Sequence, residues 1–261
     1  MTKLHAVFFP GWRMLLCILA APMLAAASDP VTNVPVAPAD IVMFGDSTTA
    51  LRPGKIKSVY TARVGEALAQ VDPTLRVANA GVGGNTTGDA RARFERDVLA
   101  CRPRIVVMQF GINDACVRIY KKPPETESRV SLADYEANLR AMIGQAREHG
   151  IKVVLMTTNP LRWTDELRGY YGRAPYHPEE VDGFESPFLS KYNAVVRRLA
   201  AELGVPLVDI NAVFMAASAK TNQPVEHWLL DGMHPNDDGH QLVTDALLPV
   251  LRRLLGEGAS S

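Results

Sequence analysis

The chain has 261 residues, of which 47% are hydrophobic and 21% are charged. This composition indicates a globular protein with enough apolar side chains for a sizeable core. Lysine plus arginine equal aspartate plus glutamate, at 28 each, so the formal net charge is zero. Because there is no basic excess and no run of lysine and arginine, we expect no nucleic-acid partner.

The first 27 residues have the order of a signal peptide. A basic start precedes an apolar run over residues 14–26, and small side chains up to Ala27 supply a cleavage site. The run is shorter than the roughly 20 residues of a spanning helix, so we expect no stable membrane span after cleavage. An uncleaved anchor is the alternative. Residues 28–38 predict a Pro-rich linker before a single domain over residues 39–257. The expected location is therefore periplasmic or secreted.

Apolar segments alternate with amphipathic ones along the predicted domain. Five short segments are typical of buried strands, at residues 40–44, 75–80, 104–110, 151–157 and 206–210. Helical patterns stand between and after them, at residues 59–71, 89–99, 131–149, 186–204 and 238–255. This alternation predicts an α/β fold with three layers, in which helices cover both faces of a five-stranded parallel sheet. Five such strands fit a flavodoxin-like order, 2-1-3-4-5.

Residues that can carry chemistry follow four of the predicted strands. Ser47 follows the first strand, Gly84 the second and Asn113 the third. Asp231 and His234 come after the fifth strand. Because ligands bind outside the carboxyl ends of the strands in open α/β sheets, we expect these residues to converge on one rim of the sheet.

This set of residue types matches the needs of acyl transfer. A serine hydroxyl becomes a nucleophile when a histidine takes its proton, and a carboxylate on the far ring nitrogen fixes the tautomer. Asp231 and His234 are three positions apart, which suits a pair held in one turn. Each residue could instead serve as a helix cap or a turn residue. Their joint occurrence at strand ends favours the catalytic interpretation, and their spacing does not favour a metal site.

The chain resembles the SGNH hydrolases, also called the GDSL esterase and lipase family. Four sequence blocks carry the resemblance, in the order that the family has: Gly45-Asp46-Ser47, Asn79-Ala80-Gly81-Val82-Gly83-Gly84, Gly111-Ile112-Asn113-Asp114 and Asp231-Gly232-Met233-His234-Pro235. Each block is weak by itself, but the set covers nearly the whole predicted domain. No Gly-x-Ser-x-Gly nucleophile elbow is present, which argues against the α/β-hydrolase fold.

The resemblance implies a role for each matching residue. Ser47 would be the nucleophile, His234 the general base and Asp231 its partner. The oxyanion hole would consist of the backbone amides of Ser47 and Gly84 and the side chain of Asn113. Members of the family hydrolyse esters or thioesters without a metal or an organic cofactor.

The long segment after the fourth strand is the best indication of the substrate. Residues 159–188 hold Trp163, Tyr170 and Tyr171 among charged and polar side chains. Aromatic faces mixed with polar groups suit sugar rings better than long acyl chains, although these rings could instead form a small core. We therefore expect a serine esterase acting on short acyl esters, O-acetyl groups on a carbohydrate above all. The alternatives are a lysophospholipase, thioesterase or arylesterase, or a sugar-binding relative without activity.

Overall fold

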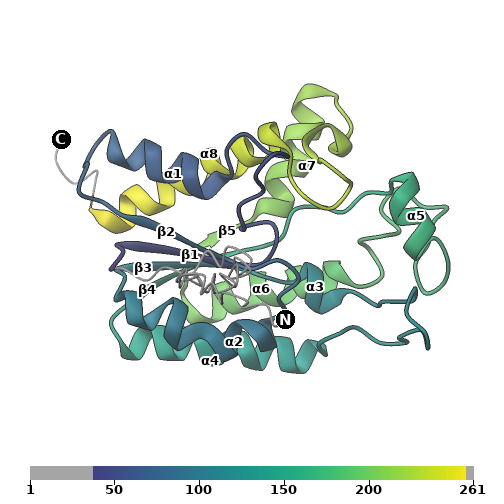
Figure 1. Ribbon diagram of the computed structural model, residues 1–261, viewed down its shortest axis with the longest axis horizontal. Coiled ribbons are helices and arrows are strands. Elements are labelled where there is room, and N and C mark those ends of the chain that lie inside the picture. The colour runs from purple at the N-terminus through teal and green to yellow at the C-terminus, as the bar shows by residue number, and fades with distance from the viewer. Residues whose placement is uncertain (1–37, 257–261) are drawn as a thin grey trace, which may run out of the picture. The chain divides into compact units, whose positions relative to one another are not determined.

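The computed structural model describes residues 38–256, so the predicted signal peptide and residues 28–37 of the predicted linker lie outside the described residues. One sheet of five parallel strands runs through this part of the chain, in the order β2-β1-β3-β4-β5 (Figure 1). This observation confirms the predicted fold class and strand order. None of the helices in residues 38–256 combines the length and apolarity needed to cross a membrane.

The strands end at one level of the sheet, which brings their following loops together. Their bounds are β1 Ile41–Gly45, β2 Val77–Gly81, β3 Ile105–Gln109, β4 Lys152–Met156 and β5 Leu207–Val208. The last residue of β1, Gly45, pairs with Gly81 of β2 and with Gln109 of β3. All residues of β1 and β3 are buried, as expected for central strands with both faces covered. The chain therefore leaves each strand at the same rim.

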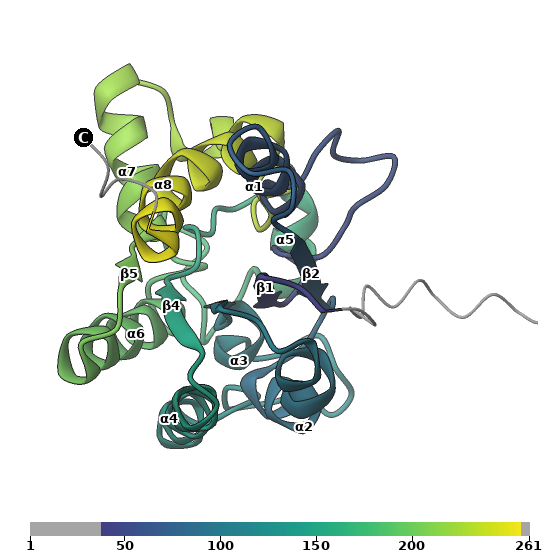
Figure 2. The same ribbon diagram turned by 90° about the vertical axis from the view of Figure 1, so that its left-hand side faces the viewer.

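Helices cover both faces of the sheet and divide the core in two (Figure 2). One layer contains α1 Tyr60–Ala69, α7 Ile210–Thr221 and α8 Asp237–Leu255. The other layer contains α2 Thr87–Asp97, α4 Leu132–Glu148 and α6 Leu189–Leu203. Four short helical segments complete the described part: η1 Leu99–Cys101, α3 Ile112–Ala115, α5 Asp165–Tyr171 and η2 Val225–Trp228.

Side-chain caps explain where two elements differ from the predicted bounds. Helix α2 begins two residues before the predicted start, because Thr86 and Asp89 form a reciprocal capping box. Strand β5 ends earlier than predicted, because Asp209 caps α7 by accepting a hydrogen bond from the backbone N–H of Ala212. Both caps place a helix start close to the rim where the strands end.

Candidate active site

Ser47 lies in a turn after β1 that a buried carboxylate holds in place. Asp46, 1% exposed, accepts hydrogen bonds from the backbone N–H and the hydroxyl of Thr48, both at 2.9 Å. Burial raises the pKa of Asp46, and the two bonds from Thr48 oppose that shift. The turn presents the Ser47 hydroxyl to the loop that precedes α8.

The structure brings together the three residues predicted to form a catalytic triad. Ser47 Oγ lies 2.9 Å from His234 Nε2, although the two residues are 187 positions apart. On the other side of the ring, His234 Nδ1 lies 2.8 Å from Asp231 Oδ2 and 3.0 Å from Oδ1. Since a carboxylate only accepts, Nδ1 carries the proton and Nε2 is left to accept the Ser47 hydroxyl. This arrangement suits proton transfer from Ser47.

Asp231 is held in its ionised form by several donors. Partial burial raises its pKa, but the hydrogen bond and charge of His234 and the backbone N–H groups of His234 and Met233 lower it to about 2. Those N–H groups donate to Oδ1 at 2.9 and 3.1 Å. Asp231 therefore stays negative at neutral pH, where it orients the imidazole and can stabilise the imidazolium.

The turn from Asp231 to His234 depends on contacts with the loop after β4. Gly232 has a φ of 80°, and a Cβ there would lie 2.4 Å from the Arg162 carbonyl oxygen, so a side chain does not fit. The backbone N–H of Arg162 donates to the Gly232 carbonyl at 2.8 Å. The buried Asn159 side chain donates to the Met233 carbonyl at 2.9 Å. Asn159 is a supporting residue that the sequence patterns did not single out.

Asn113 and the loop that carries Gly84 lie beside the turn that holds Ser47. Asn113 Nδ2, from the start of α3, lies 3.1 Å from the Asn85 carbonyl oxygen and 3.4 Å from Asp46 Oδ2. A Cβ built on Gly83, the neighbour of Gly84, would lie 3.9 Å from Ser47 Cβ. Gly84 itself has a φ of 76° and is exposed. The loops after β1, β2 and β3 thus meet at Ser47, and the assignment of Gly84 as a donor stays a prediction.

Arg93, on α2, links the carboxyl ends of β1 and β2 to the loop that follows β2. It is 8% exposed, and its guanidinium donates to the Gly45 carbonyl at 2.9 Å, the Ala80 carbonyl at 2.8 Å and the Asn85 side chain at 2.7 Å. Asp97, one turn later on α2, accepts from Nη1 at 2.8 Å. Sequence reasoning missed Arg93, although an arginine paired at i,i+4 on the apolar face of a helix is a usable signal.

The segment over residues 159–188 after β4, called the insertion from here on, holds a packed group of aromatic side chains and an exposed one. Trp163 is 9% exposed, its Nε1 donates to the Glu180 carbonyl at 3.0 Å, and its ring lies 5.0 Å from that of Phe184. Tyr171 is 7% exposed and packs against the same ring, at 5.1 Å. Tyr170 is 50% exposed and lies 5.6 Å from Tyr120. The structure therefore places Trp163 in a small core of the insertion, and Tyr170 on its surface.

A cavity of about 130 Å³ lies beside the candidate oxyanion hole. Asn113 and Met233 line it on the side of the triad, and Tyr171 lines it on the side of the insertion. Arg118 and Arg129 come from the connection between α3 and α4. The cavity is therefore framed by the two long connections that follow β3 and β4.

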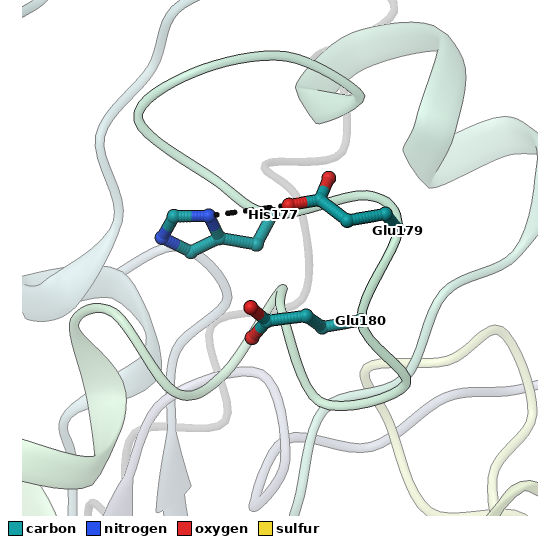
Figure 3. A group of neighbouring side chains, drawn as sticks. All are labelled: His177, Glu179 and Glu180. Carbon is teal, nitrogen blue, oxygen red and sulfur yellow. Dashed lines mark ion pairs between the residues drawn. The ribbon is translucent and has the colours of Figure 1, made fainter.

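One group of side chains in the insertion has the spacing of metal ligands. Figure 3 shows His177, Glu179 and Glu180 on one loop, with ligand atoms that lie within 4.8 Å of one another. His177 Nδ1 is 3.5 Å from a Glu179 carboxylate oxygen. All three residues are exposed, and exposed acidic groups often gather without a metal ion. Nothing in their surroundings links them to Ser47.

Comparisons with known proteins identify the family of the chain. The model of the GDSL-like Lipase/Acylhydrolase family matches residues 43–242, which is more than half of the chain. The chain is 32% identical to an uncharacterized lipoprotein, YqeF, of Bacillus subtilis over 217 residues, covering 80% of this chain and 87% of that protein. It is also 32% identical to an acetylxylan esterase of Geobacillus stearothermophilus over 221 residues, covering 80% and 91% of the two chains.

Solved structures of that acetylxylan esterase, Axe2, share the fold. One crystal structure superposes with a TM-score of 0.62 at 28% identity, covering 85% of this chain and 96% of that chain. Other structures are of its catalytic mutants, in which a serine, an aspartate or a histidine is replaced by alanine, and the aspartate and histidine are three positions apart. The chain therefore belongs to the GDSL-like lipase/acylhydrolase family and is a carboxylic ester hydrolase.

Proposed function

We propose that the protein hydrolyses short acyl esters with Ser47 as nucleophile, and that its substrate is an O-acetyl group on a carbohydrate. The observation that carries the proposal is the continuous chain of short contacts from Ser47 through His234 to Asp231. The relatives described as acetylxylan esterases support the acetyl and carbohydrate parts of the proposal. The exposed Tyr170 beside Tyr120 offers aromatic surface for a sugar.

In the first half of the proposed reaction, His234 Nε2 takes the proton as Ser47 Oγ attacks the ester carbonyl carbon. The negative charge that forms on the carbonyl oxygen accepts hydrogen bonds from the Ser47 and Gly84 amides and from Asn113 Nδ2. The bond between the acetyl carbon and the sugar oxygen then breaks, and His234 gives its proton to that oxygen, which departs as the free sugar hydroxyl and leaves an acetyl group on Ser47. Asp231 remains ionised throughout, because its pKa of about 2 is far below neutral pH.

In the second half, His234 takes a proton from a water molecule that attacks the acetyl carbonyl. The same donors face the second oxyanion, and collapse of the intermediate returns the proton to Ser47 and releases acetate. In this proposal the chain itself supplies the nucleophile, the base, the orienting carboxylate and the donors for the oxyanion.

The experiment that tests the proposal compares 4-nitrophenyl esters from acetate to decanoate, together with acetate release from acetylated xylooligosaccharides. We expect acetate to be the best chromogenic substrate and turnover to fall by several orders of magnitude in Ser47→Ala and in His234→Ala. Turnover close to wild type in either folded variant would contradict the mechanism. A long-chain optimum would favour the lysophospholipase or thioesterase alternative.

We also infer that the protein is exported, with residues 1–27 as signal peptide and residues 39–257 as the single catalytic domain. The similarity to a lipoprotein and to a xylan-degrading enzyme supports this location. Fractionation of the producing cells, with N-terminal sequencing of the mature protein, tests it. A full-length protein found in the cytosol would contradict it.

A further inference from the structure

The cavity beside Asn113 has positive charge in its wall and no lining carboxylate. Its charged lining side chains are Arg118 and Arg129. Glu125, outside the lining, accepts hydrogen bonds from Nε of Arg118 at 2.9 Å and from its Nη2, so this charge is compensated. Within residues 38–256, Arg129 takes part in no such ion pair. Among the described residues, Arg129 therefore faces the cavity region without a carboxylate in direct contact. At longer range, burial raises the pKa of Asp89, and its hydrogen bonds together with the charge of Arg129 bring that pKa below its usual value.

Arg129 keeps most of its hydrogen-bonding capacity available. It is half-buried, and its Nη1 donates to the Gly84 carbonyl at 3.0 Å. A guanidinium has five N–H donors in a planar fork, and two parallel ones match the two oxygens of a carboxylate. A partly desolvated arginine binds an anion more strongly than one in bulk water. Arg129 is thus placed to bind an anionic group next to the candidate oxyanion hole.

The rest of the cavity has aromatic walls and room for part of a sugar unit. It has about 130 Å³, less than the roughly 150 Å³ of a cavity that holds one benzene molecule, so the remainder of an acetylated sugar would lie outside it. Tyr120 and Tyr171 line it, with ring centroids 5.4 Å apart and planes at 88°. Aromatic faces bind the apolar faces of sugar rings, while a few polar groups set the orientation. Among the polar lining residues, Asn113 Nδ2 lies 3.4 Å from Asp46 Oδ2, and Arg129 Nη1 lies 3.0 Å from the Gly84 carbonyl oxygen.

We propose that the cavity binds a sugar unit that carries a carboxylate, such as an O-acetylated uronic acid, and that Arg129 binds this carboxylate. The inference rests on the proposed function, because it takes the substrate to be a sugar ester that Ser47 attacks and the protein hydrolyses. A site built around a charged hydrogen bond discriminates against a neutral analogue, since the arginine then loses its anionic partner. Arg129 is a specificity-determining residue in this proposal.

The test measures acetate release from the methyl glycoside of O-acetylated glucuronic acid and from the matching uronamide, which has a neutral amide in place of the carboxylate. We expect wild type to prefer the acid in kcat/KM by about tenfold or more, the usual effect of a hydrogen bond to a charged group. The ratio for Arg129→Gln is expected to fall close to one. The control is Lys121→Gln, which removes a positive charge from an exposed residue of the same connection outside the cavity lining and should keep the wild-type ratio.

The outcomes separate this inference from the proposed function. Similar turnover of acid and amide by wild type would overturn the carboxylate site and leave the sugar esterase intact. Loss of both activities in equal proportion in Arg129→Gln would show that Arg129 only holds the Gly84 loop. Hydrolysis of 4-nitrophenyl acetate without acetate release from any acetylated sugar would overturn both proposals, because the esterase would then not act on carbohydrates.

Discussion

The Asp114→Asn variant is expected to gain stability relative to wild type as the pH rises from 4 to 7.5. Asp114 follows Asn113 in α3 and is fully buried. Its Oδ1 accepts hydrogen bonds from the backbone N–H of Thr87 at 2.8 Å and from the Thr87 hydroxyl at 2.5 Å, while Oδ2 has no partner in the described part of the chain. Burial, opposed by the Thr87 bonds, raises the pKa from 3.8 to about 6.

Proton binding by Asp114 makes wild type less stable as the pH rises. Between pH 3.8 and about 6 the native state holds a proton that the unfolded state has released, so the free energy of unfolding falls as the pH rises through this window. A shift of about two units corresponds to roughly 3 kcal/mol. Asparagine keeps an acceptor for both Thr87 donors and never ionises. The free energy of unfolding of the variant minus that of wild type should therefore increase by up to about 3 kcal/mol from pH 4 to pH 7.5.

Urea unfolding of both proteins at pH 4, 5, 6 and 7.5 measures this difference. Asp182→Asn is the matched control, because Asp182 is exposed and lies in the insertion. Its difference from wild type should vary little with pH. A constant difference for Asp114→Asn, or one that moves in favour of aspartate as the pH rises, would refute the argument that burial dominates at this carboxyl group.

Three further predictions concern catalysis and the insertion. Asn113→Ala should lower kcat for 4-nitrophenyl acetate by roughly 10²–10³-fold with a smaller effect on KM, because the donor acts on the oxyanion. The control Asn138→Ala, on α4, should keep a kcat close to that of wild type. Tyr170→Ala should reduce kcat/KM for an acetylated sugar more than for 4-nitrophenyl acetate, and equal losses would remove it from the sugar site. Trp163→Ala should lower the free energy of unfolding by about 3–5 kcal/mol in denaturant titrations, because the ring is buried; a change below about 1 kcal/mol would contradict its place in the core.

The sheet could be predicted from the sequence because its signal is local. The four residues 41–44 of β1 and 105–108 of β3 are apolar in unbroken runs, and the structure buries every one of them. Strand β5 was predicted too long, because the cap at Asp209 competes with strand pairing. Such boundaries depend on a single hydrogen bond, which a periodicity pattern does not contain.

The candidate site was predictable to the level of residue type and order. Ser47, Asn113 and the Asp231–His234 pair stand at strand ends, and parallel strands bring those ends to one rim. The supporting residues were not predictable in the same way. The i,i+4 spacing of Arg93 and Asp97 indicates a pair on α2, but the bonds of Arg93 to Gly45 and Ala80, on two other elements, come from the tertiary structure.

The sequence by itself determined the order along the chain of the five strands and of the helices α1, α2, α4, α6 and α8. It also determined the chemistry of the loops and the pairing of Asp231 with His234, because these depend on residue type and short spacing. Only the tertiary structure decided that Trp163 is packed against Phe184 while Tyr170 is exposed, and that Arg129 borders a cavity beside Asn113. Burial and charge compensation result from contacts between segments far apart in the chain. The composition of the insertion is the same whether a ring faces a sugar or another ring, so packing makes that choice.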